Sequence, residues 1–97
     1  MRYEIELAPE AIQDLKRPNA SHRARVKAAM ETHLRHEPTR SSKSGVKRLR
    51  GLSRPQYRLR VDDLRVFYDV SKGCVGVLAI VAKADVDAWL SKVGERS

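Results

Sequence analysis

The sequence predicts an α+β fold in which two N-terminal helices pack on a small antiparallel sheet and a short helix follows. Three observations predict it: a strand-like alternation near the N-terminus, two short helical patterns after it, and three strand-like runs joined by tight turns. Ninety-seven residues with 41% hydrophobic content support one modest core, so we expect a single domain over residues 1–97.

The first part of the chain predicts a strand and two helices. Residues 3–7 alternate apolar and polar side chains, as a half-buried strand does. Pro9 suits the first turn of a helix that stops before Pro18. Asn19 or Ser21 can cap a second helix, which ends before the next proline.

The second part predicts a basic loop, a three-stranded meander and a final helix. Residues 39–56 are basic and contain serine and glycine, so we expect a loop. Strand-like runs follow at 57–61, 64–70 and 74–81. The joints between these runs are short enough for hairpins. Apolar side chains at i, i+3, i+4 and i+7 from Val86 predict the last helix, with Asp85 at its cap position. The element order is therefore β-α-α-β-β-β-α. One helical layer on this sheet would leave its other face open.

The charge of the chain points to a polyanionic or acidic partner. Twenty Lys+Arg against twelve Asp+Glu give a formal net charge of +8. Nine basic residues and only two acids lie between residues 40 and 65, so the excess forms a patch. The nine are Arg40, Lys43, Lys47, Arg48, Arg50, Arg54, Arg58, Arg60 and Arg65. Glycine and proline interrupt this segment, and no run of 18 apolar residues occurs, so we expect no membrane partner.

Cysteine and histidine usage predicts a cytoplasmic protein without a metal. The N-terminal segment MRYEIELAPE has acids where a signal peptide needs an apolar stretch, and Cys74 alone cannot form an internal disulfide. His33 and His36 are three residues apart, but no cysteine or acid cluster completes a zinc site. We expect no cofactor.

The segment QYRLRVDDLRVFY, residues 56–68, places three arginines in a strand-like pattern. If Asp62-Asp63 is a two-residue turn, alternation puts Arg58, Arg60, Arg65 and Phe67 on one face and an apolar set on the other. Like charges in direct opposition destabilise a sheet. Two interpretations stay open: a solvated strand face, or phosphate binding with base stacking on an exposed Phe67.

Two stretches resemble the RelE/ParE superfamily of bacterial toxins from toxin–antitoxin pairs. They are KRLRGLSRPQYRLRVDDLRVFYDV at 47–70 and VLAIVAKADVDAW at 77–89. The family pattern is a Leu-Arg/Lys-Gly loop, a Tyr-Arg-Leu-Arg strand, a short turn, Tyr-Arg-Val-Tyr, a hydrophobic strand and a terminal helix. The β-α-α-β-β-β-α order matches as well, so the resemblance covers nearly the whole chain.

The resemblance implies two alternative activities. The RelE-like branch cleaves mRNA in the ribosomal A site without metal, by attack of a ribose 2′-OH on the neighbouring phosphate. The ParE-like branch poisons DNA gyrase and is not known as a nuclease. Both are neutralised by a small antitoxin that usually also binds operator DNA. The implied partners are therefore a cognate antitoxin, the ribosome and mRNA, with operator DNA reached only through the antitoxin complex.

The resemblance also implies roles for individual residues. Arg58 and Arg60 stand where RelE-like toxins have basic residues that activate the nucleophile and stabilise the transition state. Arg65 stands at a phosphate-binding arginine of the second strand, and Lys83 at, or within one position of, another arginine of the site. Trp89 falls where many members have a tyrosine that stacks on a base. The apolar stripe of the last helix gives Trp89 a second interpretation, which is core packing.

Two features depart from the RelE-like pattern. Trp89 has no phenol to give a proton, and positions 58 and 60 carry arginine, whose permanently charged guanidinium is a poor general base. The leading hypothesis is a RelE-like mRNA endonuclease, and the alternatives are a ParE-like gyrase inhibitor and a basic binding module without catalysis. Three loop residues are candidate RNA contacts, with a solvated loop as the alternative: Lys47, Arg48 and Arg50.

Overall fold

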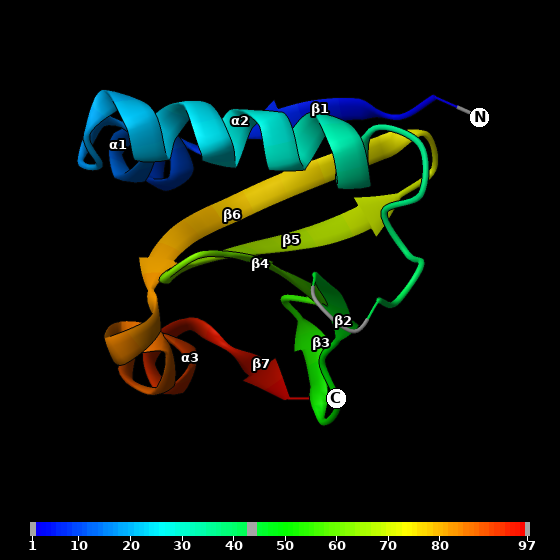
Figure 1. Cartoon of the computed structure of the whole chain (residues 1–97). Helices are drawn as coiled ribbons and strands as arrows, with labels where there is room; N and C mark the ends of the chain where they lie inside the picture. Colours follow the sequence, from blue (N-terminus) through cyan, green and yellow to red (C-terminus); the bar gives the residue numbers. More distant parts are fainter. Residues whose placement is uncertain (1, 43–44, 97) are drawn as a thin grey trace.

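The order of strands and helices confirms the α+β architecture that the sequence predicts and adds three short strands. The computed structural model describes residues 2–42 and 45–96. In chain order the elements are β1 (Glu4–Leu7), α1 (Pro9–Lys16), α2 (Ala20–Leu34), β2 (Val46–Arg48), β3 (Leu52–Arg54), β4 (Tyr57–Val61), β5 (Leu64–Ser71), β6 (Cys74–Ala82), a 3₁₀ turn (Lys83–Asp85), α3 (Val86–Val93) and β7 (Glu95–Arg96). Helices α1 and α2 lie on one side of the main sheet, and α3 lies on the other side (Figure 1).

Local sequence signals position the two N-terminal helices. Pro9 occupies the first turn of α1, where its missing N–H is not needed. Asn19 caps α2, because its side chain accepts a hydrogen bond of 2.9 Å from the His22 N–H.

No helix in the described part of the chain is long and apolar enough to cross a membrane.

The main sheet has the strand order β1-β6-β5-β4-β2. Strands β4, β5 and β6 form the predicted antiparallel meander. The N-terminal strand β1 pairs in parallel with β6, from Glu4 opposite Cys74 to Leu7 opposite Val77, so the sheet is mixed. A parallel pair needs a long crossover, and here the crossover contains both N-terminal helices and the whole meander up to β6.

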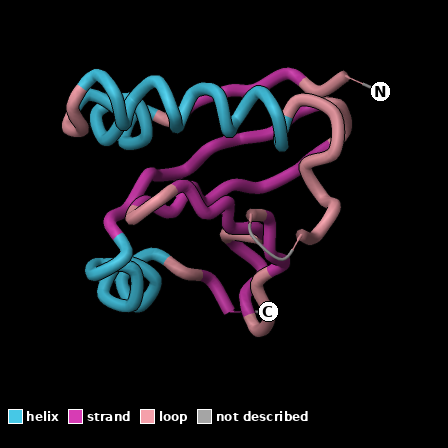
Figure 2. Tube along the Cα trace, viewed as in Figure 1, coloured by secondary structure: helices cyan, strands magenta, loops and turns pink. Residues whose placement is uncertain are grey.

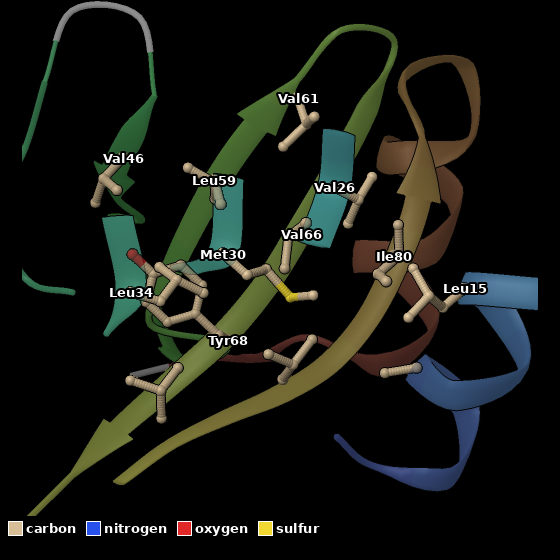
Figure 3. Packing of buried hydrophobic residues seen from close by; sticks show 13 residues of the cluster. Leu15, Val26, Met30, Leu34, Val46, Leu59, Val61, Val66, Tyr68 and Ile80 are labelled. Atoms are coloured by element: carbon tan, nitrogen blue, oxygen red, sulfur yellow. The ribbon is translucent and has the colours of Figure 1, made fainter. Parts of the chain in front are cut away.

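The main core lies between the two N-terminal helices and the sheet. Figure 3 shows Leu15, Val26, Met30 and Leu34 of the helices directed at side chains of β4, β5 and β6. The buried sheet residues of this core are Val46, Leu59, Val61, Val66, Tyr68, Val75, Val77 and Ile80. The predicted apolar face of the meander is therefore the face that the helices cover.

Tyr68 is the largest fully buried side chain of the structure. Its ring stacks on Tyr57 with a centroid distance of 5.4 Å, and its hydroxyl donates a 2.6 Å hydrogen bond to the Pro38 carbonyl. Burial, and to a lesser degree the neighbouring Tyr57, raises the pKa of Tyr68 well above its ordinary value. The phenol therefore stays neutral in the folded protein at a pH where it ionises in the unfolded chain.

This pKa shift predicts a loss of stability in alkali. Because the folded-state pKa is raised, the stabilisation is complete below the unfolded-state pKa of about 10 and declines as the pH rises above it. We expect Tyr68→Phe to lower the free energy of unfolding by about 1 kcal/mol below pH 9, because the hydrogen bond is lost. Above pH 10 the free energy of unfolding of the variant should decline less steeply with pH. Urea unfolding at a series of pH values from 8 to 11.5 measures both effects. An unchanged alkaline slope in the variant would contradict the prediction.

The second face of the sheet is open only in part, which corrects the sequence-based expectation of an open face. Helix α3 lies against it, and a second buried cluster forms from Phe67, Ala79 and Val81 of the sheet. Val86, Trp89 and Leu90 of α3 pack on this cluster, together with Leu49. The apolar stripe predicted the helix correctly, but a stripe alone does not tell which surface the helix will cover.

The prediction of a loop over residues 39–56 is wrong in two places. Strand β2 pairs with β4 at the edge of the main sheet, and β3 pairs with β7 in a separate two-stranded sheet. The connection from α2 runs past one end of the main sheet before it reaches β2 (Figure 2). Both strands are three residues long, which is too short for an alternation of side chains to be recognised.

Gly94 joins α3 to β7 at a point where no other side chain fits. Its N–H donates a 2.8 Å hydrogen bond to the Leu90 carbonyl oxygen, and a Cβ at this position would lie 2.6 Å from the same oxygen. We expect Gly94→Ala to shift this junction and cost about 1–3 kcal/mol, with faster hydrogen exchange in β3 and β7. Ser91→Ala, at an exposed position of α3, is the control. Equal stability of the two variants would refute the prediction.

Candidate nucleic-acid interface

The β4–β5 hairpin folds in the predicted register. Asp62 and Asp63 form the turn, and Arg58 lies opposite Phe67 and Arg60 opposite Arg65. Asp62 takes a positive φ of 53°, a conformation that aspartate tolerates better than most residues. We call the sheet face that carries Lys47, Arg58, Arg60 and Arg65 the arginine face.

Two rows of paired residues cross the arginine face. One row runs from Lys47 on β2 through Arg58 and Phe67 to Ala79 on β6. The next row contains Arg60, Arg65 and Val81. Helix α3 covers the β5 and β6 ends of these rows, while Lys47 and Arg60 at the β2 and β4 ends are exposed. The accessible part of the face is therefore a basic strip along β4 beside an apolar border.

Arg58 lies at the centre of this strip and is only half-buried. Its Nε is the buried side-chain nitrogen in the described residues that has no hydrogen-bond acceptor. The pKa of the guanidinium is lowered from its ordinary value, first by burial and then by the positive charges of Arg65 and Arg60. A bound anion would relieve both effects, because it would accept from the unpartnered donor and neutralise the cluster.

Arg65, the predicted phosphate-binding residue of the second strand, is largely buried instead of lying exposed on the strip. Its side chain is 7% exposed, and Nη1 donates to the carbonyl oxygens of Asp62 and Leu64, both at 2.9 Å. These bonds tie the guanidinium to the β4–β5 turn. Arg65 therefore contributes positive charge beneath the strip, while its Nη1 stabilises the turn.

Phe67 is not an exposed stacking surface, so that expectation is wrong. The ring is fully buried and stacks under Trp89, with a centroid distance of 4.8 Å and an interplanar angle of 19°. Of the two interpretations of Trp89, the structure supports packing, although the side chain stays half-buried. The indole N–H donates to Glu10 on α1 at 3.3 Å. A nucleic-acid base has no access to the Phe67 ring while α3 is in place.

The other candidate RNA-binding and catalytic residues lie at different places in the fold. Lys47 joins the arginine face, whereas Arg48 lies on the opposite face with its guanidinium 5.2 Å from the Tyr57 ring centroid. Arg50 is exposed in the turn between β2 and β3. Lys83 is exposed at the end of β6, where its main-chain N–H donates to the Asp63 carbonyl at 2.7 Å. Lys43, counted in the basic patch, lies outside the described residues.

The accessible strip offers charge and hydrogen-bond donors. The two rows contain no histidine, carboxylate or tyrosine among their paired residues. One row further along β5, the Asp69 carboxylate shares this face, but it is engaged by Arg54 at 3.1 Å and by the Gln56 N–H at 2.7 Å. The described part of the chain also contains no group of three or more histidine, cysteine, aspartate or glutamate residues that could hold a metal ion. The sequence did not predict that Leu49, Val86 and Leu90 form the apolar border of the strip. An apolar stripe indicates that a helix packs against something, but not which surface it packs against.

Comparison with known families and structures places this geometry in context. A family model described as the ParE toxin of type II toxin–antitoxin systems, parDE, matches residues 5–86. A sequence search finds no match among curated proteins.

Several solved toxin–antitoxin complexes contain a similar fold. The archaeal RelE-RelB complex from Pyrococcus horikoshii OT3 includes a chain with 24% identity and a TM-score of 0.70, matched over 86% of this chain and 97% of that one. The RelBE2 complex from Mycobacterium tuberculosis gives 22% identity and a TM-score of 0.67, over 84% and 99%. The DinJ-YafQ complex of E. coli gives 16% and 0.68, over 89% and 98%. At these identities the likeness shows the fold alone.

Proposed function

The chain belongs to the family of ParE toxins of type II toxin–antitoxin systems, and we propose that it acts as a metal-independent endonuclease on ribosome-bound mRNA. This is the activity that the resemblance to RelE-like toxins implies. The observation that carries the proposal is the strip of cationic donors along β4, in which the Arg58 Nε has no acceptor and like charges are paired across strands. An RNA phosphate supplies the missing acceptor and the missing negative charge.

The proposed reaction is an internal transfer at phosphorus. The 2′-oxygen of a ribose attacks the adjacent phosphorus and gives up its proton to solvent. The bond from phosphorus to the 5′-oxygen breaks, and that oxygen takes a proton from water. The products are a 2′,3′-cyclic phosphate and a 5′-hydroxyl. Arg58 and Arg60 would hold the phosphate oxygens and stabilise the negative charge that grows in the transition state.

The absence of an acid–base pair on the described strip limits the contribution of proton transfer. Guanidinium groups are poor bases because they remain charged, so their proposed role is electrostatic. Lys47 and the more distant Lys83 would contact the phosphates on either side of the scissile one. We assign Arg65 a supporting role through its charge, since its side chain is largely buried and its Nη1 is engaged by the turn.

Primer extension on stalled ribosomes tests the proposal. Purified protein is added to ribosomes halted on a defined message, and we expect a cut in the A-site codon that Arg60→Gln strongly reduces. Arg40→Gln is the matched control, because Arg40 is also exposed but pairs with Glu37 outside the arginine face. The proposal fails if the wild type makes no A-site cut, or if both variants cut equally.

A second function is favoured by the same lack of acid–base groups and by the matching family model. A ParE-like toxin would inhibit DNA gyrase by binding alone and would need no catalytic proton transfer. A supercoiling assay with purified gyrase distinguishes the two functions. Full supercoiling activity in the presence of excess toxin excludes this second function.

The neighbouring structures are toxin–antitoxin complexes, which supports a cognate antitoxin as a partner. An acidic antitoxin segment on the arginine face would relieve the repulsion between its cations. We therefore propose that the antitoxin covers the strip, and that ribosome and mRNA are reached only by the free toxin. Operator DNA would be contacted through the antitoxin.

A further inference from the structure

A groove lined in part by the β4–β5 turn is rich in acidic residues, whereas the arginine face is positively charged. It has a volume of about 710 Å³ and lies between α1, the start of α2, the β4–β5 turn, the end of β6 and α3. Its apolar lining residues are Leu64, Ile80, Val81, Ala82, Ala88 and Trp89. We call it the β6 groove. The volume lies within the range of sites that bind ligands or peptide segments.

The β6 groove follows a stretch of strand edge that has no partner strand. β1 pairs with β6 only over residues 74–77, whereas β6 continues to Ala82. In the unpaired stretch the Ile80 N–H donates to the Asp14 carboxylate at 2.9 Å, which shows that the main chain of Ile80 faces away from β5. The Ala82 carbonyl is the N-cap acceptor of the 3₁₀ turn Lys83–Asp85 and is used within that turn. Because main-chain groups alternate along a strand, the Ile80 carbonyl and the Ala82 N–H face the same edge. An extended segment could pair with them as an added strand.

The charge of the β6 groove is negative on a strongly basic protein. Five of the twelve acids of the chain line it, against Arg17 and Lys92 out of twenty Lys+Arg, with His22 as the remaining titratable residue. The five acids are Glu10, Asp14, Asp62, Asp63 and Asp85.

Some of these acids already have partners. Asp14 lies 3.5 Å from Arg17, Asp62 pairs with Arg25 at 3.2 Å, and Glu10 accepts from Trp89. Among the described residues, Asp63 and Asp85 have no ion pair within 4.0 Å and are exposed at the rim. These two carboxylates remain available to a cationic guest.

We propose that the β6 groove binds an extended segment of a partner protein in which lysine or arginine alternates with small apolar side chains. The main chain of the segment would donate to the Ile80 carbonyl and accept from the Ala82 N–H, because the Ile80 N–H is already engaged by Asp14. Alternation would direct its apolar side chains toward the groove lining and its cations toward Asp63 and Asp85. Nucleic acid and acidic peptides are excluded from this groove by its charge. The inference does not depend on the proposed nuclease activity, because it concerns a separate surface.

A peptide of alternating valine and lysine, six residues long and blocked at both ends, is the probe. The +8 charge of the whole protein opposes its binding, so association requires a local acidic site. Trp89 is the one tryptophan of the chain and lines the groove, so its fluorescence reports occupancy. We expect saturable binding with amide chemical-shift changes at Ile80 and Ala82. The same peptide with glutamate in place of lysine should not produce them.

Two variants locate the binding. Asp63→Asn with Asp85→Asn should weaken the lysine peptide roughly five- to thirty-fold, as expected for two exposed ion pairs. The matched control is Glu4→Gln with Glu37→Gln, which changes the net charge equally but lies outside the groove. A peptide with N-methyl groups on alternate residues keeps its charges and should lose binding, because it cannot donate to the β6 edge.

Several outcomes would overturn the inference. They are equal affinity for the lysine and glutamate peptides, equal weakening by the two double variants, and full binding of the N-methylated peptide. Self-association of the protein that is abolished by Asp63→Asn with Asp85→Asn would assign the groove to a second copy and overturn it too. Loss of mRNA cleavage alone would leave the inference standing, since the binding experiment contains no RNA.

Discussion

Replacing Arg58 with glutamine should reduce cleavage of ribosome-bound mRNA by about two to three orders of magnitude, the loss typical of removing one preorganised donor to a developing charge. Arg58 is central in the arginine face, and its Nε has no acceptor within the described protein. The Arg58 charge is half-buried and its pKa is lowered by burial and by two neighbouring arginines. We therefore expect the same substitution to stabilise the fold, because it removes a charge that the folded state disfavours.

The expected gain in stability is of the order of 0.5 kcal/mol, or a few degrees in Tm for a domain of this size. Cleavage assays and thermal unfolding on the same preparation measure both quantities. Opposite signs of the two changes would identify a residue retained for function at a cost in stability. Arg58→Lys keeps a positive charge but loses the planar guanidinium, so its cleavage activity should lie between those of the wild type and Arg58→Gln. A parallel fall of activity and stability in Arg58→Gln would contradict the proposed role.

The second large effect concerns Phe67. We expect its replacement by alanine to lower the free energy of unfolding by about 3–5 kcal/mol. The ring is fully buried between β5 and α3 and stacks on Trp89. Since small domains have only about 5–15 kcal/mol of total stability, the variant should be partly unfolded near 37 °C. Chemical denaturation followed by Trp89 fluorescence measures the loss directly.

Val93→Ala, on the helix α3 that covers Phe67, is the control, because the Val93 side chain is exposed and its truncation should change stability by less than about 0.5 kcal/mol. Phe67→Leu should recover much of the loss, as it restores apolar volume without an aromatic ring. If Phe67 instead contacted RNA, the alanine variant would lose activity at a temperature where it is still fully folded. That result would contradict the burial of this ring.

The sequence predicts the β4–β5 hairpin well because several local signals agree. The Asp62-Asp63 turn, the alternation of the two strands and the need to bury one face all specify the same register, which the structure confirms. Asn19 and Pro9 likewise mark helix ends through their own hydrogen bonding and φ angles. These features depend on neighbours in the sequence, so they can be recognised without knowledge of the fold.

The features that could not be predicted depend on contacts between distant segments. The burial of Phe67 follows from the position of Trp89, twenty-two residues later, and the covered part of the arginine face follows with it. The five acids of the β6 groove come from three separate parts of the chain and form no charged run. Strand β3 pairs with β7, which follows only after β4, β5, β6 and α3 in the chain.

The parallel pairing of β1 with β6 has a consequence for the synthesis of the protein. Glu4 lies opposite Cys74, so the first strand waits for its partner while the ribosome adds the residues between them. At about 5–20 residues per second this takes roughly 4–14 s. The β4–β5 hairpin is made earlier but remains without β6 and α3 beside it. The residues of the basic strip are therefore synthesised before those of α3, which form most of its apolar border.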